Sequence, residues 1–133
     1  MKLFIIALAV TLLATAPSFA APGDPGHSHG HSHKGPNGGV VADVPGGHAE
    51  LVESPSELAV YLTDEDLKPM ASDKASAKAT ILAGGKTETL DLAPSAPNKL
   101  AVALAAPLAK GARVVVSVKT RAGKTFQLRH QKK

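Results

Sequence analysis

Between residues 40 and 130 the chain consists of short runs in which apolar residues occupy every second position. The clearest runs are Leu58, Val60 and Leu62, then Leu100, Val102 and Leu104, and then Val114, Val116 and Val118. Successive side chains of a β-strand point to opposite faces, so each run predicts a strand with one buried face. The predicted strands cover residues 40–44, 48–53, 57–63, 75–82, 87–92, 99–104, 113–121 and 125–130.

Turn-forming residues separate these strands at intervals of about 8–12 residues, which is typical of an antiparallel β-sandwich or barrel. We therefore predict an all-β domain over residues 39–131, an immunoglobulin-like antiparallel β-sandwich of about seven to eight short strands. The segments 83–86 and Ala122-Gly123 are predicted hairpin turns. The alanine-rich segment 73–83 is the one helical competitor, but its alternation and the following Gly84-Gly85 favour a strand.

Residues 1–20 have the composition of a secretion signal. Lys2 supplies the positive end, residues 3–16 form an apolar run, and Ser18-Phe19-Ala20 fits a small-x-small cleavage site. The apolar run is shorter than the about 20 residues that a membrane-spanning helix needs. We expect cleavage after Ala20, a periplasmic or otherwise secreted protein, and no stable membrane anchor; an uncleaved anchor is the alternative.

Residues 21–38 form a leader that is rich in glycine, proline and histidine and contains no valine, leucine, isoleucine or aromatic residue. Such a segment has nothing to bury against a core. We therefore predict that it is disordered until a ligand binds. The turn formers of residues 35–39 end the leader immediately before the first predicted strand.

Composition narrows the possible functions. The absence of cysteine excludes disulfides and thiolate ligands. The formal net charge of +4 arises mainly from basic residues near the C-terminus, but few aromatics accompany them, so we expect no nucleic-acid partner. No serine lies near a histidine in a nucleophile motif, and no acid pair is arranged for catalysis. We therefore do not expect an enzyme.

The leader carries the one recognisable chemical motif, in which four histidines alternate with serine or glycine: His27, His29, His31 and His33. Neutral imidazole binds Zn, Cu, Ni and Co, and a short His-rich tract is typical of metal binding. Without cysteine, a divalent transition metal is favoured over Cu(I), with Cu(II) strongest on affinity grounds. Because binding must order the tract, at about 1–2 kcal/mol per residue, we expect an adaptable ligand segment.

Two residues of the predicted domain are further candidate ligands. His48 and Glu50 lie two positions apart in a predicted strand, so their side chains share one face. An imidazole and a carboxylate there can complete a metal site that the leader begins. The alternative is an exposed strand pair without a metal. We expect His130, near the C-terminus, to be only a surface residue.

A family resemblance covers essentially the whole chain after the secretion signal. Residues 34–39 (Lys-Gly-Pro-Asn-Gly-Gly) and 47–52 (Gly-His-Ala-Glu-Leu-Val) resemble small periplasmic proteins associated with heavy-metal efflux systems. In that group a His-rich leader runs into a His-Gly-Pro-x-Gly-Gly motif, and the β-domain then begins with His-x-Glu-Leu. The resemblance continues through residues 61–64, 68–69, 81–86 and 111–116. Lys34 stands where the pattern usually has histidine, so a ligand role at that position is lost.

This resemblance implies a periplasmic accessory protein that associates with metal, and it identifies neither the metal nor an enzymatic activity. We expect the partners to be a metal ion and a metal-efflux or other envelope protein. The alternative is an envelope protein-interaction or structural β-sandwich module whose His-rich leader is incidental. Metal-dependent changes in the leader distinguish the two.

Overall fold

The computed structural model describes residues 33–133, so the predicted secretion signal and the leader as far as residue 32 lie outside the described residues. The described part is all-β, as predicted. No helix between residues 33 and 133 is long and apolar enough to cross a membrane. The nine strands are β1 (His33–Lys34), β2 (Val40–Val44), β3 (Gly47–Glu53), β4 (Glu57–Thr63), β5 (Ser76–Ala83), β6 (Lys86–Ala96), β7 (Lys99–Ala103), β8 (Arg113–Lys119) and β9 (Thr125–Gln131).

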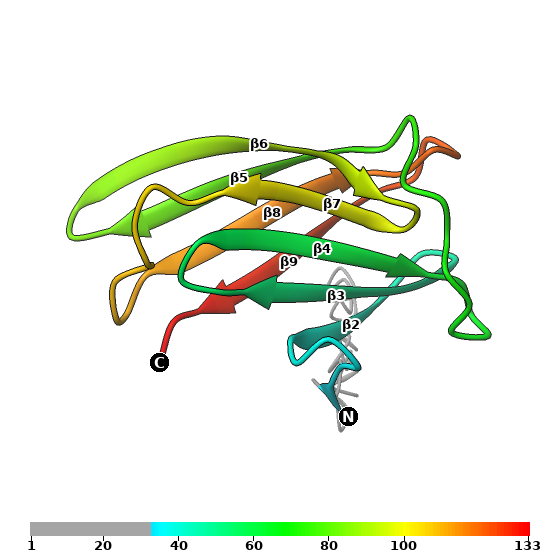
Figure 1. Cartoon of the computed structure of the whole chain (residues 1–133), viewed down its shortest axis with the longest axis horizontal. Coiled ribbons are helices and arrows are strands. Elements are labelled where there is room, and N and C mark those ends of the chain that lie inside the picture. The colour runs from blue at the N-terminus through cyan, green and yellow to red at the C-terminus, as the bar shows by residue number, and fades with distance from the viewer. Residues whose placement is uncertain (1–32) are drawn as a thin grey trace, which may run out of the picture.

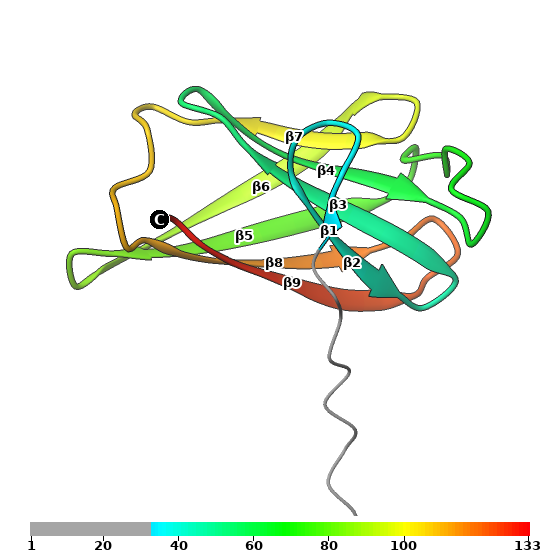
Figure 2. The ribbon, with the colours of Figure 1, turned by 90° about the horizontal axis from the view of Figure 1, so that it is seen from below.

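All pairings are antiparallel, and the strands form one curled sheet in the order β1-β2-β3-β4-β7-β6-β5-β8-β9 (Figure 1). Strand β6 joins the two halves of the sheet, because its first part pairs with β5 and its last part pairs with β7. The register shifts near Pro94, a residue that has no N–H to donate to a ladder. Figure 2 shows β3, β4 and β7 lying over β5, β8 and β9.

The core lies between these two halves and is aliphatic. Leu58, Val60 and Leu62 of β4 face Val114, Val116 and Val118 of β8 within one buried cluster. The alternation in the sequence therefore identifies the inward faces of these strands correctly. The loss of water from such side chains is the main favourable term in folding, at about 25 cal/mol per Å².

Local turn chemistry explains how β5 and β6 are joined. Gly84 and Gly85 have φ values of 56° and 75°, and a two-residue hairpin turn with two positive φ values strongly favours glycine. The predicted strand across the alanine-rich segment is confirmed as β5, which pairs on both sides. Eight strands lie within a few residues of their predicted bounds; β1 and the extension of β6 to Ala96 are additional.

An ionic contact ties the two halves together at one end. Glu53 at the end of β3 accepts a hydrogen bond from Lys132 Nζ at 2.6 Å, and its other carboxylate oxygen lies 3.2 Å from His130 Nε2. The Glu53 side chain is only 9% exposed. Strands β3 and β9 are distant in the sheet order, so this contact helps the sheet to curl. His130 is therefore half-buried and paired, and the expectation that it is only a surface residue was wrong.

The core assignment predicts different costs for two leucines. Leu58→Ala removes a fully buried side chain from β4, so we expect a loss of about 2–5 kcal/mol in the free energy of unfolding. Leu82→Ala on β5 removes a side chain that is 44% exposed, and the change should stay within about 0.5 kcal/mol. Urea unfolding measures both, and equal losses would show that the inward face is misassigned.

Candidate functional site

The candidate ligands of the described chain lie on the outer face of β2, β3 and β4. Directly paired residues share a face, and one such row crosses the strands from β1 to β7. It consists of His33, Val41, Glu50, Tyr61 and Lys99. A parallel row holds Asp43, His48 and Thr63. The predicted shared face of His48 and Glu50 is therefore present, and His33 is on it as well.

Glu50 is buried, with 5% exposure, and its carboxylate is occupied by the turn that precedes β2. Oε1 accepts hydrogen bonds from the backbone N–H groups of Asn37 at 2.9 Å and Gly39 at 2.8 Å. Oε2 accepts one from Asn37 Nδ2 at 2.8 Å. A buried carboxylate is costly unless it is paired or hydrogen-bonded, and these three donors stabilise it. Glu50 thus anchors the turn of residues 35–39 to β3.

Gly35 is needed for this close approach. A Cβ atom on Gly35 would overlap the Glu50 carboxylate, and one on Gly39 would overlap the backbone oxygen of Leu51. The chain is therefore held against the domain from His33 onward, whereas the predicted disordered leader extends to residue 38 and the predicted domain starts at Gly39. The difference arises because two of the three donors that satisfy Glu50 belong to Asn37, in the predicted leader, and the third belongs to Gly39, the first residue of the predicted domain.

His48 has a different environment from Glu50. Its Nδ1 lies 2.9 Å from Asp43 Oδ1 on the neighbouring strand, and its side chain is 27% exposed. A carboxylate can only accept, so Nδ1 carries the proton and donates it to Asp43. This leaves Nε2 as the ring nitrogen with a lone pair, in an arrangement that resembles the carboxylate–histidine pairs found behind many metal-bound imidazoles.

The structure does not bring the sequence-predicted ligands together into a complete site. Among residues 33–133, no three His, Cys, Asp or Glu side chains are gathered closely enough to hold a metal ion. His48 and Glu50 share a face, but their side chains have different partners. The Glu50 carboxylate accepts hydrogen bonds from the backbone of Asn37 and Gly39, whereas the His48 imidazole pairs with Asp43. His27, His29 and His31 lie outside the described residues.

A small depression adjoins His48 on this outer face. It has a volume of about 260 Å³ and is lined in part by His48, Tyr61, Leu67 and Pro69. Leu67 is 67% exposed and has a φ of 63°, a backbone conformation that residues with a Cβ seldom adopt. The turn is held by Asp64, whose Oδ1 accepts from the N–H groups of Asp66 and Lys68, both at 2.9 Å.

Lys99 on β7 lies at the opposite end of this row from His33. Its Nζ lies 2.7 Å from Glu57 Oε1 and 5.6 Å from the centre of the Tyr61 ring. The hydrogen bond to Glu57, with a smaller contribution from Tyr61, raises the pKa of the Lys99 ammonium above its ordinary value. Lys99 therefore stays charged at neutral pH, and it is suited to pairing and not to acting as a base.

Larger hollows lie elsewhere on residues 33–133. One, of about 500 Å³, is lined in part by Arg113, Arg129 and His130, and the His130 imidazole is paired with Glu53.

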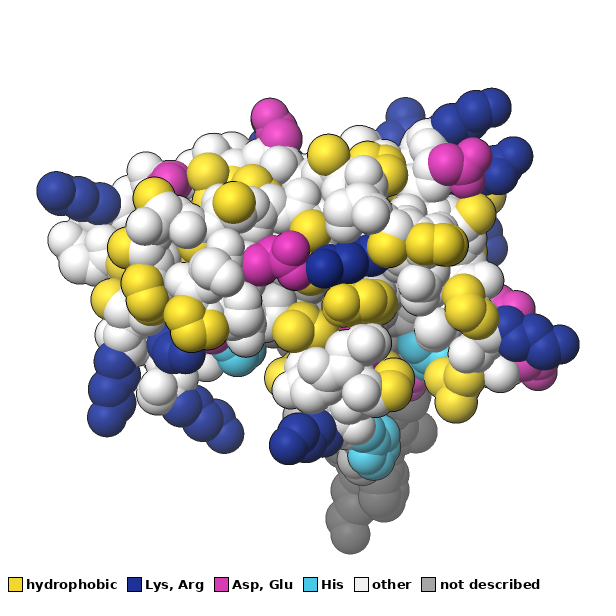
Figure 3. Space-filling model, in the orientation of Figure 1, with side chains coloured by type: hydrophobic (Ala, Val, Ile, Leu, Met, Phe, Trp, Pro, Cys, Tyr) yellow, Lys and Arg dark blue, Asp and Glu magenta, His cyan; other side chains and the backbone are white. Residues whose placement is uncertain are grey.

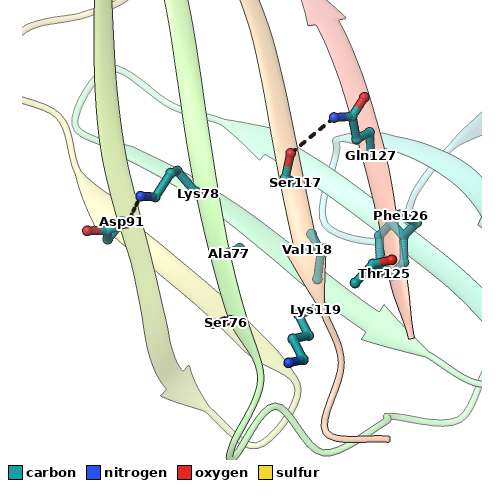
Figure 4. Close-up of a pocket in the computed structure, with 10 residues that line it drawn as sticks. All are labelled: Ser76, Ala77, Lys78, Asp91, Ser117, Val118, Lys119, Thr125, Phe126 and Gln127. Carbon is teal, nitrogen blue, oxygen red and sulfur yellow. Dashed lines mark hydrogen bonds and ion pairs between the residues drawn. The ribbon is translucent and has the colours of Figure 1, made fainter. Parts of the chain in front are cut away.

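An open depression of about 480 Å³ lies over β5, β8 and β9, where Lys78 faces Asp91 and Gln127 donates to Ser117 (Figure 4). It contains no histidine, and its ion pair is 3.6 Å long and exposed. Figure 3, in the orientation of Figure 1, shows acidic and basic side chains scattered over the visible face, with no broad surface of one sign.

Comparison of the chain with protein-family models, with curated proteins and with solved structures found no match. The functional argument therefore depends on the chemistry of the residues themselves.

The role of Glu50 as an anchor predicts its mutational cost. Glu50→Ala leaves three donors without their buried acceptor, so we expect the free energy of unfolding without metal to fall by about 1.5–3 kcal/mol. Glu65→Ala, in an exposed turn, is the matched control and should change it by less than about 0.5 kcal/mol. Urea unfolding monitored by circular dichroism measures both. A Glu50→Ala protein as stable as the control would show that the turn does not depend on this carboxylate.

Proposed function

We propose that this protein is an exported accessory protein that binds a divalent transition metal through its His-rich leader and presents it from the β-domain. The observation that carries the proposal is the Asp43–His48 pair, which orients an imidazole on the face where the leader joins the sheet. The leader histidines His27, His29, His31 and His33 supply most of the ligands, and His48 adds one from the folded domain.

The direction of β1 supports this arrangement. His33 pairs with Val41 and Lys34 pairs with Val40, so β1 runs antiparallel to β2. His33 therefore lies at the end of β1 that is nearer to Asp43 of β2, which pairs with His48. The Glu50 anchor fixes the turn after β1 and so holds His33 and Lys34 at this edge of the sheet.

The donor set favours a borderline metal ion. Imidazole nitrogen with a carboxylate behind it suits Zn(II), Cu(II), Ni(II) or Co(II), whereas Ca(II) and Mg(II) prefer oxygen ligands. Glu50 has its carboxylate committed to Asn37 and Gly39, so it is better described as a positioning residue than as a ligand. The resemblance to proteins of heavy-metal efflux systems suggests a metal-efflux or other envelope protein as the recipient.

The alternative function is an envelope protein-interaction or structural module with an incidental leader. The observation that favours it is the depression beside Tyr61, with the exposed Leu67 at its rim. In that case the protein would bind a partner with or without metal. Both proposals describe a non-enzymatic protein.

The metal proposal is tested by calorimetric titration of the chain that begins at Ala21 with Zn, Cu, Ni and Co salts. We expect binding near neutral pH and release of much of the metal by about pH 5, because imidazole coordinates only when neutral and has an unperturbed pKa of about 6.5. The variant with His27, His29, His31 and His33 all replaced by alanine should lose most of the binding.

The matched control replaces a histidine of the β-domain that is not a candidate metal ligand. His130→Gln removes an imidazole that is paired with Glu53 on the far edge of the domain, so metal binding should persist. An isotherm that the fourfold alanine variant leaves unchanged would eliminate the leader as the site. A wild-type chain that binds none of the four metals would favour the interaction module instead.

A further inference from the structure

Two large hydrophobic side chains are exposed among residues 33–133, and they lie at opposite ends of the molecule. Leu67, in the turn after β4, is 67% exposed, and Leu82, near the end of β5, is 44% exposed. Figure 1 shows β4 ending at the right of the long axis and the β5–β6 hairpin at the left. A single exposed leucine is common on protein surfaces, so the groups around each one decide whether it indicates a contact.

The depression of about 500 Å³ beside Leu82 combines an apolar and a basic part. Its lining includes Leu82, Arg113, Val115 and Arg129. Leu82 pairs with Arg113, and Val115 pairs with Arg129, so these side chains share the outer face of β5, β8 and β9. Arg113 and Arg129 are diagonal neighbours on adjacent strands, at a spacing of about 7–8 Å. We call this site the arginine depression.

The two guanidinium groups have no acidic partner between residues 33 and 133. Neither Arg113 nor Arg129 belongs to an ion pair there, and Arg129 donates only to Gln127 Oε1, at 3.5 Å. Like charges at this spacing repel each other, so anionic groups bound beside them would stabilise both. A guanidinium group matches the geometry of a carboxylate, to which it donates two parallel hydrogen bonds.

The turn of residues 64–67, which we call the acidic turn, presents the complementary groups. Glu65 and Asp66 are exposed and directly precede Leu67. The Leu67 N–H donates to the Asp64 backbone oxygen at 3.1 Å, and the Asp64 N–H donates to that of Lys68 at 2.9 Å. The φ of 63° at Leu67 is a conformation that persists only where the surrounding bonds impose it. The turn therefore holds two carboxylates and a leucine in one arrangement.

We propose that the acidic turn of one copy of this chain docks in the arginine depression of a second copy. The two exposed carboxylates pair with the two guanidinium groups, and Leu67 packs against Leu82. Both leucines thereby lose contact with water, which favours association. Because the turn and the depression lie at opposite ends of the molecule, the contact is head-to-tail, and a pair of copies keeps one free turn and one free depression.

The size of the contact predicts weak association. Stable interfaces bury about 1,200–2,000 Å², more than one turn in one depression covers. The ion pairs lie at the surface, so salt screens them, with a Debye length of about 8 Å at physiological ionic strength. We therefore expect self-association that rises with protein concentration and falls with added salt. It involves neither His48 nor the leader, so it is independent of the proposed metal binding.

The test is sedimentation velocity of the chain that begins at Ala21, over a series of concentrations in metal-free buffer at low ionic strength. One variant carries Arg113→Gln and Arg129→Gln and keeps its acidic turn. A second carries Glu65→Gln and Asp66→Asn and keeps its arginine depression. All four side chains are exposed, so circular dichroism should show both variants folded.

We expect each variant alone to lose about tenfold or more in association constant, since two exposed ion pairs contribute up to about 1 kcal/mol each. An equimolar mixture should recover association and stop at pairs, because only one turn and one depression in each pair remain intact. The matched control carries Lys78→Gln and Lys119→Gln on the same outer face, outside the arginine depression. It removes the same positive charge and should associate as the wild type does.

Three results would overturn the inference: a wild type that stays monomeric at every concentration, association that survives in either variant alone, or an equal loss in the lysine control. A mixture of the two variants that fails to associate would also overturn it, because an intact turn and an intact depression are then both present. None of these results bears on the proposed function, which is tested by metal titration.

Discussion

The buried carboxylate of Glu50 is the interaction on which the candidate site depends. It accepts hydrogen bonds from Asn37 and Gly39, and Gly35 lacks the Cβ that would collide with it. A carboxylate in this position without donors would be strongly destabilising, so the turn of residues 35–39 has one favourable arrangement. That arrangement places β1 beside β2 and brings the chain onto the domain next to Asp43 and His48.

The proposed metal site combines an adaptable part, the leader histidines, with a fixed part, His48. The ordering of leader residues costs about 1–2 kcal/mol each, which favours metal capture only when several ligands bind together. His48, already oriented by Asp43, is a ligand that needs little further ordering. Such a division is consistent with the proposed uptake and transfer of a metal ion.

Most of the fold follows from alternation in the sequence, because one face of each strand is buried and the other is exposed. Val114, Val116 and Val118 illustrate this, and the glycine pair at the β5–β6 hairpin marks a turn by its own chemistry. Strand β1 was not predictable in this way: its two residues are both exposed, and only pairing with β2 defines it.

The site was predictable only in part, for a related reason. The shared face of His48 and Glu50 follows from their spacing, but the direction in which each side chain turns depends on distant residues. Glu50 is held by donors 11 and 13 positions earlier in the chain. His130 pairs with Glu53, which lies 77 positions earlier in the chain. The residues around either position give no signal that predicts this contact.

The most direct test of the account is NMR of the imidazole nitrogens in the chain that begins at Ala21, recorded as Zn²⁺ is added. The account predicts that Nε2 of His48 and the nitrogens of the leader histidines shift together, at the same metal ratio, while Nδ1 of His48 keeps its proton. Shifts confined to the leader histidines, with His48 unchanged at saturation, would contradict it.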